Sequence, residues 1–86
     1  MSEVPRLEFP CAYPVKVLGD NSAGFIAAVL AVFSRHFAEQ PLQSSLRPSS
    51  GGRFISVTVT VNATGADQLA ELHEALKLIE GLRLVL

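Results

Sequence analysis

Cysteine is almost absent from the sequence, since Cys11 is the only one among 86 residues. A single cysteine excludes an internal disulfide, and it cannot supply the several thiolates of a cysteine-based zinc site within one chain. We therefore expect no metal site, and no sequence motif predicts a cofactor.

An excess of positive charge is also missing. Lys and Arg number 7 against 8 Asp and Glu, which gives a formal net charge of −1 at pH 7. Such a chain produces no general positive field that attracts nucleic acid or an anionic membrane. We expect neither partner, so any ionic contact must come from charge that is gathered locally.

Long hydrophobic runs are absent too. The longest apolar run covers residues 23–33, which is short of the roughly 20 residues that a membrane-spanning helix needs. The opening sequence, MSEVPRLEFP, has neither the basic start nor the hydrophobic segment of an export signal. We expect a cytoplasmic protein in which residues 1–8 form a flexible tail and residues 9–86 form a single domain.

Periodic patterns predict the elements of the first half of the chain. Residues 13–19 alternate between apolar and other side chains with period two, which is typical of a strand. The next three residues, Asp20-Asn21-Ser22, offer side-chain oxygens for a helix N-cap, and an apolar stripe continues to Phe37. A weaker strand is predicted over residues 42–47.

The second half repeats this order. Residues 54–62 alternate strictly and are rich in β-branched side chains, which predicts the clearest strand. Thr64-Gly65-Ala66-Asp67 resembles a capping box with Thr64 as the N-cap. A second helix follows, Gly81 is placed for its C-cap, and residues 82–86 form the last strand.

The element order β-α-β-β-α-β predicts an α+β fold. Right-handed crossovers place both helices on one face of a four-stranded antiparallel sheet, which is the ferredoxin-like arrangement.

Alternation assigns each strand residue to one face of this sheet. We expect these side chains to point toward the helices: Val15, Val17, Leu46, Ile55, Val57, Val59, Val61, Leu82, Leu84 and Leu86. We expect the opposite, open face to carry Lys16, Leu18, Gln43, Ser45, Arg47, Ser56, Thr58, Thr60, Arg83 and Val85. No acid falls within the predicted strands, so the open face is neutral to basic. It is either a solvated surface or a contact surface for an anionic metabolite, a second copy of the chain or a partner protein.

The segment RPSSGGRF connects the two middle strands. It has the glycines, serines and arginines of a phosphate-binding loop, but it leads into a strand, so no helix N-terminus faces it. Pro48 favours a turn and Gly51-Gly52 permits positive φ angles. We interpret the segment as a hairpin whose arginines, Arg47 and Arg53, border the open face.

The sequence lacks the motifs that would indicate RNA binding or catalysis. RNA-binding domains with this strand order stack bases on aromatic side chains of the central strands, and here those positions carry Ser56, Thr58 and Thr60. For catalysis, His36 and His73 stand apart from Cys11 and from any carboxylate pair, and no serine lies in a Gly-x-Ser-x-Gly motif. We expect the protein not to be an enzyme.

Several segments together resemble the YbeD-like family of small bacterial proteins. They are Leu7-Glu8-Phe9-Pro10, Lys16-Val17-x-Gly19, Arg47-Pro48-Ser49-Ser50-x-Gly52, the run from Ser56 to Thr64, and Leu82-Arg83-x-Val85-Leu86. The chain departs from the pattern at Arg47, where a lysine is familiar, at Gly51 and at Pro14. The resemblance implies a ferredoxin-like fold similar to ACT regulatory domains, an unassigned biochemical function and a suggested link to lipoate metabolism.

The leading functional hypothesis is a non-enzymatic regulatory or ligand-sensing domain that binds a small anionic metabolite or a partner protein. The alternative is a self-associating module that forms a homodimer through its sheet face. The ligand-binding candidates are Lys16, Arg47, Ser49, Ser50, Gly52, Arg53 and Arg83.

Overall fold

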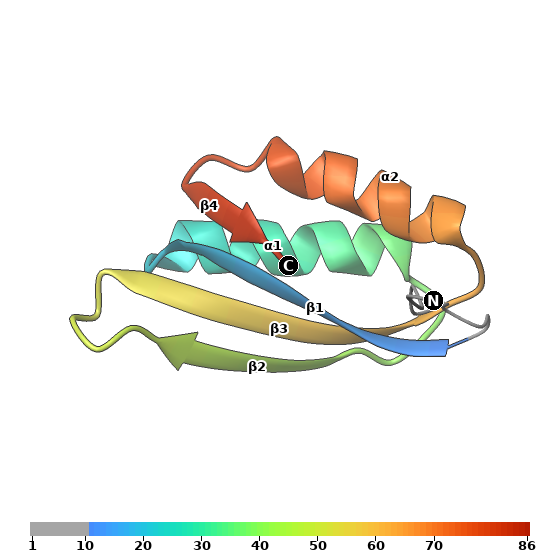
Figure 1. Ribbon diagram of the computed structural model, residues 1–86, viewed down its shortest axis with the longest axis horizontal. Helices are drawn as coiled ribbons and strands as arrows, with labels where there is room; N and C mark the ends of the chain where they lie inside the picture. Colours follow the sequence, from blue (N-terminus) through green and yellow to red (C-terminus); the bar gives the residue numbers. More distant parts are fainter. Residues whose placement is uncertain (1–10) are drawn as a thin grey trace, which may run out of the picture.

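The computed structural model describes residues 11–86. Its elements are β1 (Cys11–Asp20), α1 (Ala23–His36), β2 (Gln43–Pro48), β3 (Phe54–Ala63), α2 (Ala66–Lys77) and β4 (Leu82–Val85). Both helices lie on one side of the sheet (Figure 1). The predicted tail, residues 1–8, and the start of the domain at residue 9 lie outside the described residues.

The four strands form one antiparallel sheet in the order β2-β3-β1-β4. Together with the element order, this confirms the predicted ferredoxin-like α+β fold. In the centre of the sheet Val15 lies opposite Val59 and Val17 opposite Val57. These four side chains are fully buried, because both helices pack on their side of the sheet.

Helix α1 begins as predicted at Ser22, whose Oγ accepts a hydrogen bond of 3.1 Å from the backbone N–H of Phe25. The Phe25 ring then packs directly against the backbone of Gly19. A Cβ atom on Gly19 would lie 2.2 Å from the ring, a separation that real Cβ contacts do not reach. Glycine is therefore required at this point of β1 by close approach and not by its φ angle.

The start of helix α2 differs from the prediction. The N-cap is Gly65, which has no side chain to offer, and Thr64 lies one residue before this N-cap. Gln68 takes the role expected of Asp67, because its Oε1 accepts a hydrogen bond of 2.8 Å from the Thr64 N–H. Gly81 has the expected positive φ of +94°, but α2 ends at Lys77, so Gly81 serves the turn into β4.

The predicted faces of the last strand are wrong for three of its residues, Leu84, Val85 and Leu86. The register between β1 and β4 shifts between Leu18 and Gly19, which is a β-bulge. As a result Val85 lies opposite the buried Val17, while Leu84 lies opposite Leu18 on the open face. Leu86 follows Leu84 to that face, because it exchanges backbone hydrogen bonds with Lys16.

Candidate functional site

The open face presents basic side chains on neighbouring rows of the sheet. Lys16 in β1 lies opposite Thr58, and Arg47 in β2 lies opposite Ser56. Both basic residues are exposed. Leu18 in β1 lies opposite Ser56 on its other side. One row of the open face therefore runs from Leu18 in β1 through Ser56 in β3 to Arg47 in β2.

Two more guanidinium groups meet on one aromatic ring. The Cζ atoms of Arg53 and Arg83 lie 5.5 Å and 5.3 Å from the centroid of the Phe54 ring. Cation–π contacts at such partly exposed sites contribute about 0.5–1 kcal/mol each. The ring therefore gathers two candidate residues that are 30 positions apart in the sequence.

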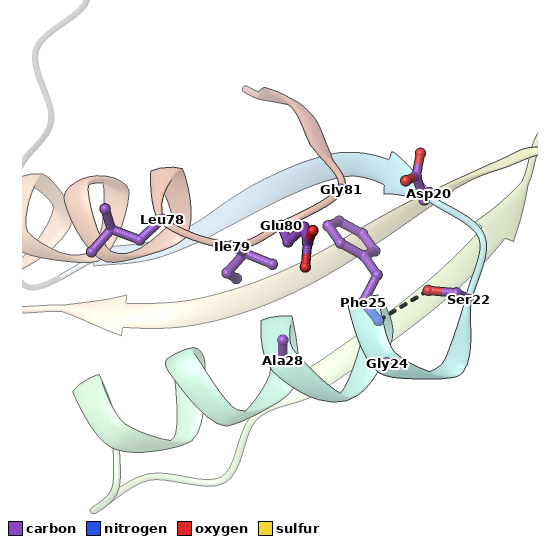
Figure 2. Close-up of a pocket in the computed structure, with 9 residues that line it drawn as sticks. All are labelled: Asp20, Ser22, Gly24, Phe25, Ala28, Leu78, Ile79, Glu80 and Gly81. Atoms are coloured by element: carbon purple, nitrogen blue, oxygen red, sulfur yellow. Dashed lines mark hydrogen bonds between the residues drawn. The ribbon is translucent and has the colours of Figure 1, made fainter.

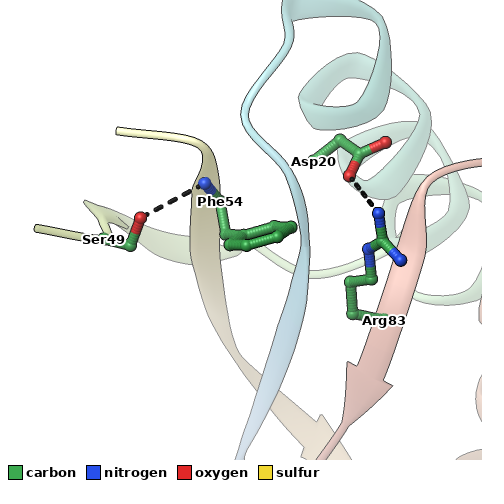
Figure 3. A network of polar contacts seen from close by, with 4 residues as sticks. All are labelled: Asp20, Ser49, Phe54 and Arg83. Atoms are coloured by element: carbon green, nitrogen blue, oxygen red, sulfur yellow. Dashed lines mark hydrogen bonds and ion pairs between the residues drawn. The ribbon is translucent and has the colours of Figure 1, made fainter. Parts of the chain in front are cut away.

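An acidic residue lies beside Arg83, contrary to the prediction that the strands contain no acid. Strand β1 extends to Asp20, whose Oδ1 lies 3.4 Å from Nη2 of Arg83 (Figure 3). The side chains of Arg83 and Asp20 remain 57% and 48% exposed, so solvent screens the pair and its contribution to stability is small. The open face is thus basic with one carboxylate at its edge.

The RPSSGGRF segment is a closed hairpin. The Ser49 N–H donates to the Phe54 carbonyl at 2.8 Å, and the Ser49 Oγ accepts from the Phe54 N–H at 3.2 Å. The Gly52 N–H donates to the Ser49 carbonyl, and Gly52 has a φ of +76°. Ser49 and Gly52 therefore build the turn, as the hairpin interpretation expects, while Ser50 is exposed.

Asn21 holds this hairpin against the start of α1. Its Nδ2 donates to the Gly52 carbonyl at 2.9 Å, and its backbone N–H donates to the Arg53 carbonyl at 3.0 Å. The sequence suggested only a helix-capping role for Asn21. A contact between residues 31 positions apart leaves no local pattern from which it could be predicted.

The structure thus divides the predicted site residues into three groups. Arg53 and Arg83 come together on Phe54, Lys16 and Arg47 occupy neighbouring rows of the open face, and the serines and Gly52 belong to the hairpin.

A hollow that is larger than those on the open face lies elsewhere, between the start of α1 and the connection from α2 to β4 (Figure 2). It has a volume of about 660 Å³, and Phe25 and Ile79 are among its apolar lining residues. Its charged lining residues are Asp20 and Glu80, and no Lys or Arg among the described residues lines it. Two carboxylates disfavour an anionic ligand, so the predicted anion binding concerns the open face and not this hollow.

The two histidines lie on different helices and both are half-buried. The Nε2 of His73 is buried and has no hydrogen-bond partner among the described residues. Within residues 11–86, no three His, Cys, Asp or Glu side chains gather as metal ligands. In the same range, no helix is long and apolar enough to cross a membrane.

Comparison with known proteins identifies the family. A family model described as "Protein of unknown function (DUF493)" matches residues 4–86. The chain belongs to this family. A UPF0250 protein of Azotobacter vinelandii is 43% identical over 98% of the chain and 94% of its own length. A UPF0250 protein of Pseudomonas aeruginosa is 40% identical over 95% of the chain and 90% of its own length. These relatives confirm the resemblance to the YbeD-like family.

Solved structures share the fold of this family member at low sequence identity. Helicobacter pylori protein HP0495 superposes with a TM-score of 0.81 at 14% identity, covering 99% of this chain and 90% of that one. The ACT domain from the GTP pyrophosphokinase of Chlorobium tepidum gives a TM-score of 0.63 at 13% identity, covering 87% and 92%. The predicted similarity to ACT domains is therefore confirmed for the fold.

Proposed function

We propose that this protein is a non-enzymatic regulatory domain that docks an acidic surface of a partner protein on its open sheet face. The charge of that face carries the proposal. Lys16, Arg47 and Arg83 come from three different strands, and Asp20 is the only acidic residue in the four described strands. Such charge complementarity steers association and selects the partner.

The shape of the open face favours a protein over a small molecule. A hollow over β2 and β3 has a volume of about 200 Å³ and is lined by polar side chains, including Ser45 and Thr58. Pockets for small ligands usually measure about 300–1,000 Å³ and enclose most of the ligand. Leu84 and Leu86, which are 46% and 60% exposed, add apolar surface beside the cations, as in the core of a protein interface.

The fold supports the regulatory part of the proposal by analogy only. The ACT domain that this chain resembles is one part of GTP pyrophosphokinase. By that analogy, the present chain acts on a partner by binding to it and not by catalysing a reaction.

The proposal is tested by titrating ¹⁵N-labelled protein with a hexaglutamate peptide. We expect chemical-shift changes around Lys16, Arg47 and Arg83, which disappear in high salt because screening weakens exposed charge pairs. The Lys16→Glu/Arg47→Glu variant should lose this binding. The matched control is Lys77→Glu, which reverses an exposed cation on α2 that pairs with Glu74. Equal binding by both variants would contradict the proposal.

A small anionic metabolite is the second candidate ligand. It is favoured by the cluster of Arg53 and Arg83 on the Phe54 ring. Two guanidinium groups within 5.5 Å of one ring centroid can bind a carboxylate or phosphate beside an apolar surface. Because the family resemblance implies a suggested link to lipoate metabolism, lipoate is the first probe, with neutral lipoamide as its control. Shifts at Arg53 and Arg83 with lipoate alone would support this candidate, and equal shifts with lipoamide would argue against it.

Self-association through the open face is the third reading. Two copies stacked face to face bring together the cations of both, and like charges oppose that contact. We therefore expect a monomer by sedimentation at low salt. A dimer that the Lys16→Glu/Arg47→Glu variant disrupts would favour self-association instead.

A further inference from the structure

Strand β2 is an unpaired edge of the sheet. Within residues 11–86 it pairs with β3 on one side only, and all six of its residues are exposed. The helices pack over β1, β3 and β4, and β2 lies at the edge away from them (Figure 1). The outer backbone groups of this strand are therefore open to a further strand.

The hairpin fixes which backbone groups point outward. Ser49 donates its N–H to the Phe54 carbonyl, so Ser49 belongs to a hydrogen-bonded pair of the β2–β3 ladder. Such pairs alternate in an antiparallel ladder, and the register continues from Ser49 without a shift through Arg47 and Ser45. Ser44 and Leu46 consequently direct their N–H and C=O groups away from β3.

The two sides of this edge differ in chemistry. On the open face the edge carries Ser45 and Arg47, next to the basic surface. On the helix side Leu46 is 49% exposed. A hollow of about 370 Å³, lined partly by Phe37 and Leu42, lies at the start of β2. A strand added here would meet positive charge on one side and apolar surface on the other.

We propose that the acidic partner docks by adding an extended segment to β2 as a fifth strand. In this segment acidic residues alternate with Val, Ile or Leu. The acidic side chains lie on the open face beside Arg47, and the apolar side chains cover Leu46. Main-chain hydrogen bonds to Ser44 and Leu46 supply affinity, and the alternating side chains supply specificity. This inference rests on the proposed function and identifies the form that its partner takes.

Charge favours such a segment over a second copy of the chain. Pairing of β2 with its counterpart in another copy would extend the sheet and join two basic open faces, with an Arg47 on each. An acidic segment instead offers opposite charge to Lys16 and Arg47.

The test uses the capped peptide Glu-Val-Glu-Val-Glu-Val and, as its control, the same peptide with alternate backbone nitrogens methylated. The control keeps every side chain but cannot donate the ladder hydrogen bonds. We expect the first peptide to slow amide exchange at Ser44 and Leu46 by at least about tenfold, because solvent-exposed donors become paired, while Ser45 and Arg47 change little. Binding of the methylated peptide should be about tenfold weaker, since each lost hydrogen bond contributes about 0.5–1.5 kcal/mol.

A Leu46→Pro variant provides the second arm. Its missing N–H points away from β3, so the native ladder keeps all its donors, and binding of the alternating peptide should fall about tenfold. Ser44→Pro serves in the same way if Leu46→Pro does not fold. Equal binding of both peptides with shifts confined to Lys16, Arg47 and Arg83 would overturn strand addition but leave the proposed function standing.

Two further outcomes also overturn the inference. Failure of both the alternating peptide and hexaglutamate to bind contradicts strand addition and the proposed function together. A dimer in sedimentation without any peptide, abolished by Leu46→Pro, would assign the β2 edge to a second copy.

Discussion

Strands β2 and β4 are both edges of the same sheet, yet they are built differently. Strand β4 has four residues, contains a bulge where it pairs with β1, and packs under α2 through Leu82 and Val85. Strand β2 has six exposed residues and keeps one register with β3. The helix layer therefore makes β4 part of the core and leaves β2 dependent on β3 and on its hairpin. This asymmetry explains why we place partner binding at β2.

The largest effect is expected where the β4 side of the sheet meets the core. Gly19→Ala would drive a Cβ atom into the Phe25 ring, and overpacking of this kind destabilises by about 1–3 kcal/mol. Urea unfolding followed by circular dichroism measures the change. Gly24→Ala is the control, because nothing lies within 4 Å of the added Cβ and alanine favours the helix by about 1 kcal/mol. Equal midpoints for the two variants would show that the ring does not need this space.

The same truncation at each edge compares them directly. Leu82→Ala removes atoms packed against the core, and we expect a loss of about 2 kcal/mol. Leu46→Ala removes atoms that are half-exposed, so its loss should stay below about 1 kcal/mol. Unfolding by urea again provides both values. A larger loss for Leu46→Ala would mean that β2 is covered in solution, for example by another copy.

The anchor of the β2 hairpin should have a smaller effect. Asn21→Ala removes the side-chain hydrogen bond to the Gly52 carbonyl, which contributes about 1 kcal/mol. We expect faster amide exchange in residues 49–53 and little change in the core strands. Ser50→Ala, an exposed substitution in the same hairpin, is the control and should alter stability by less than about 0.5 kcal/mol. Unchanged exchange in Asn21→Ala would show that the side-chain bond to Gly52 does not hold the hairpin.

Sequence patterns predicted the elements well and the edges poorly. The alternation of β3 predicts a strand that is buried on one face, and the structure confirms this burial at Ile55, Val57, Val59 and Val61. The segment Leu82-Arg83-Leu84-Val85 also alternates, but Leu84 pairs with Leu18 and Leu82 pairs with the next residue, Gly19, so one extra residue in β4 shifts its faces. Local periodicity contains no information about how a strand registers with its neighbour.

The candidate site shows the same division. Its basic residues could be read from the sequence because strand alternation places Lys16 and Arg47 on one face. Three other features depend on tertiary contacts. They are the contacts of Arg53 and Arg83 with the Phe54 ring, the ion pair of Asp20 with Arg83, and the hydrogen bond from Asn21 to Gly52. Spacing along the chain does not encode such contacts.

The smallest effect on stability is expected at Asp20 of β1, which pairs with Arg83 of the edge strand β4. Asp20→Asn removes the partner of Arg83 at 3.4 Å, and because both groups are about half exposed we expect a stability loss below about 1 kcal/mol. Binding should respond in the opposite direction. Without the one carboxylate among its described residues, the open face is more positive as a whole, and the affinity for the Glu-Val peptide should rise about twofold to fivefold at low salt and return to the wild-type value at high salt. Glu74→Gln is the control, because it breaks the exposed pair with Lys77 on α2 and leaves the open face unchanged. If both variants bind the peptide with equal affinity, the charge of the open face does not select the partner, and the apolar surface beside Leu46 would have to carry recognition alone.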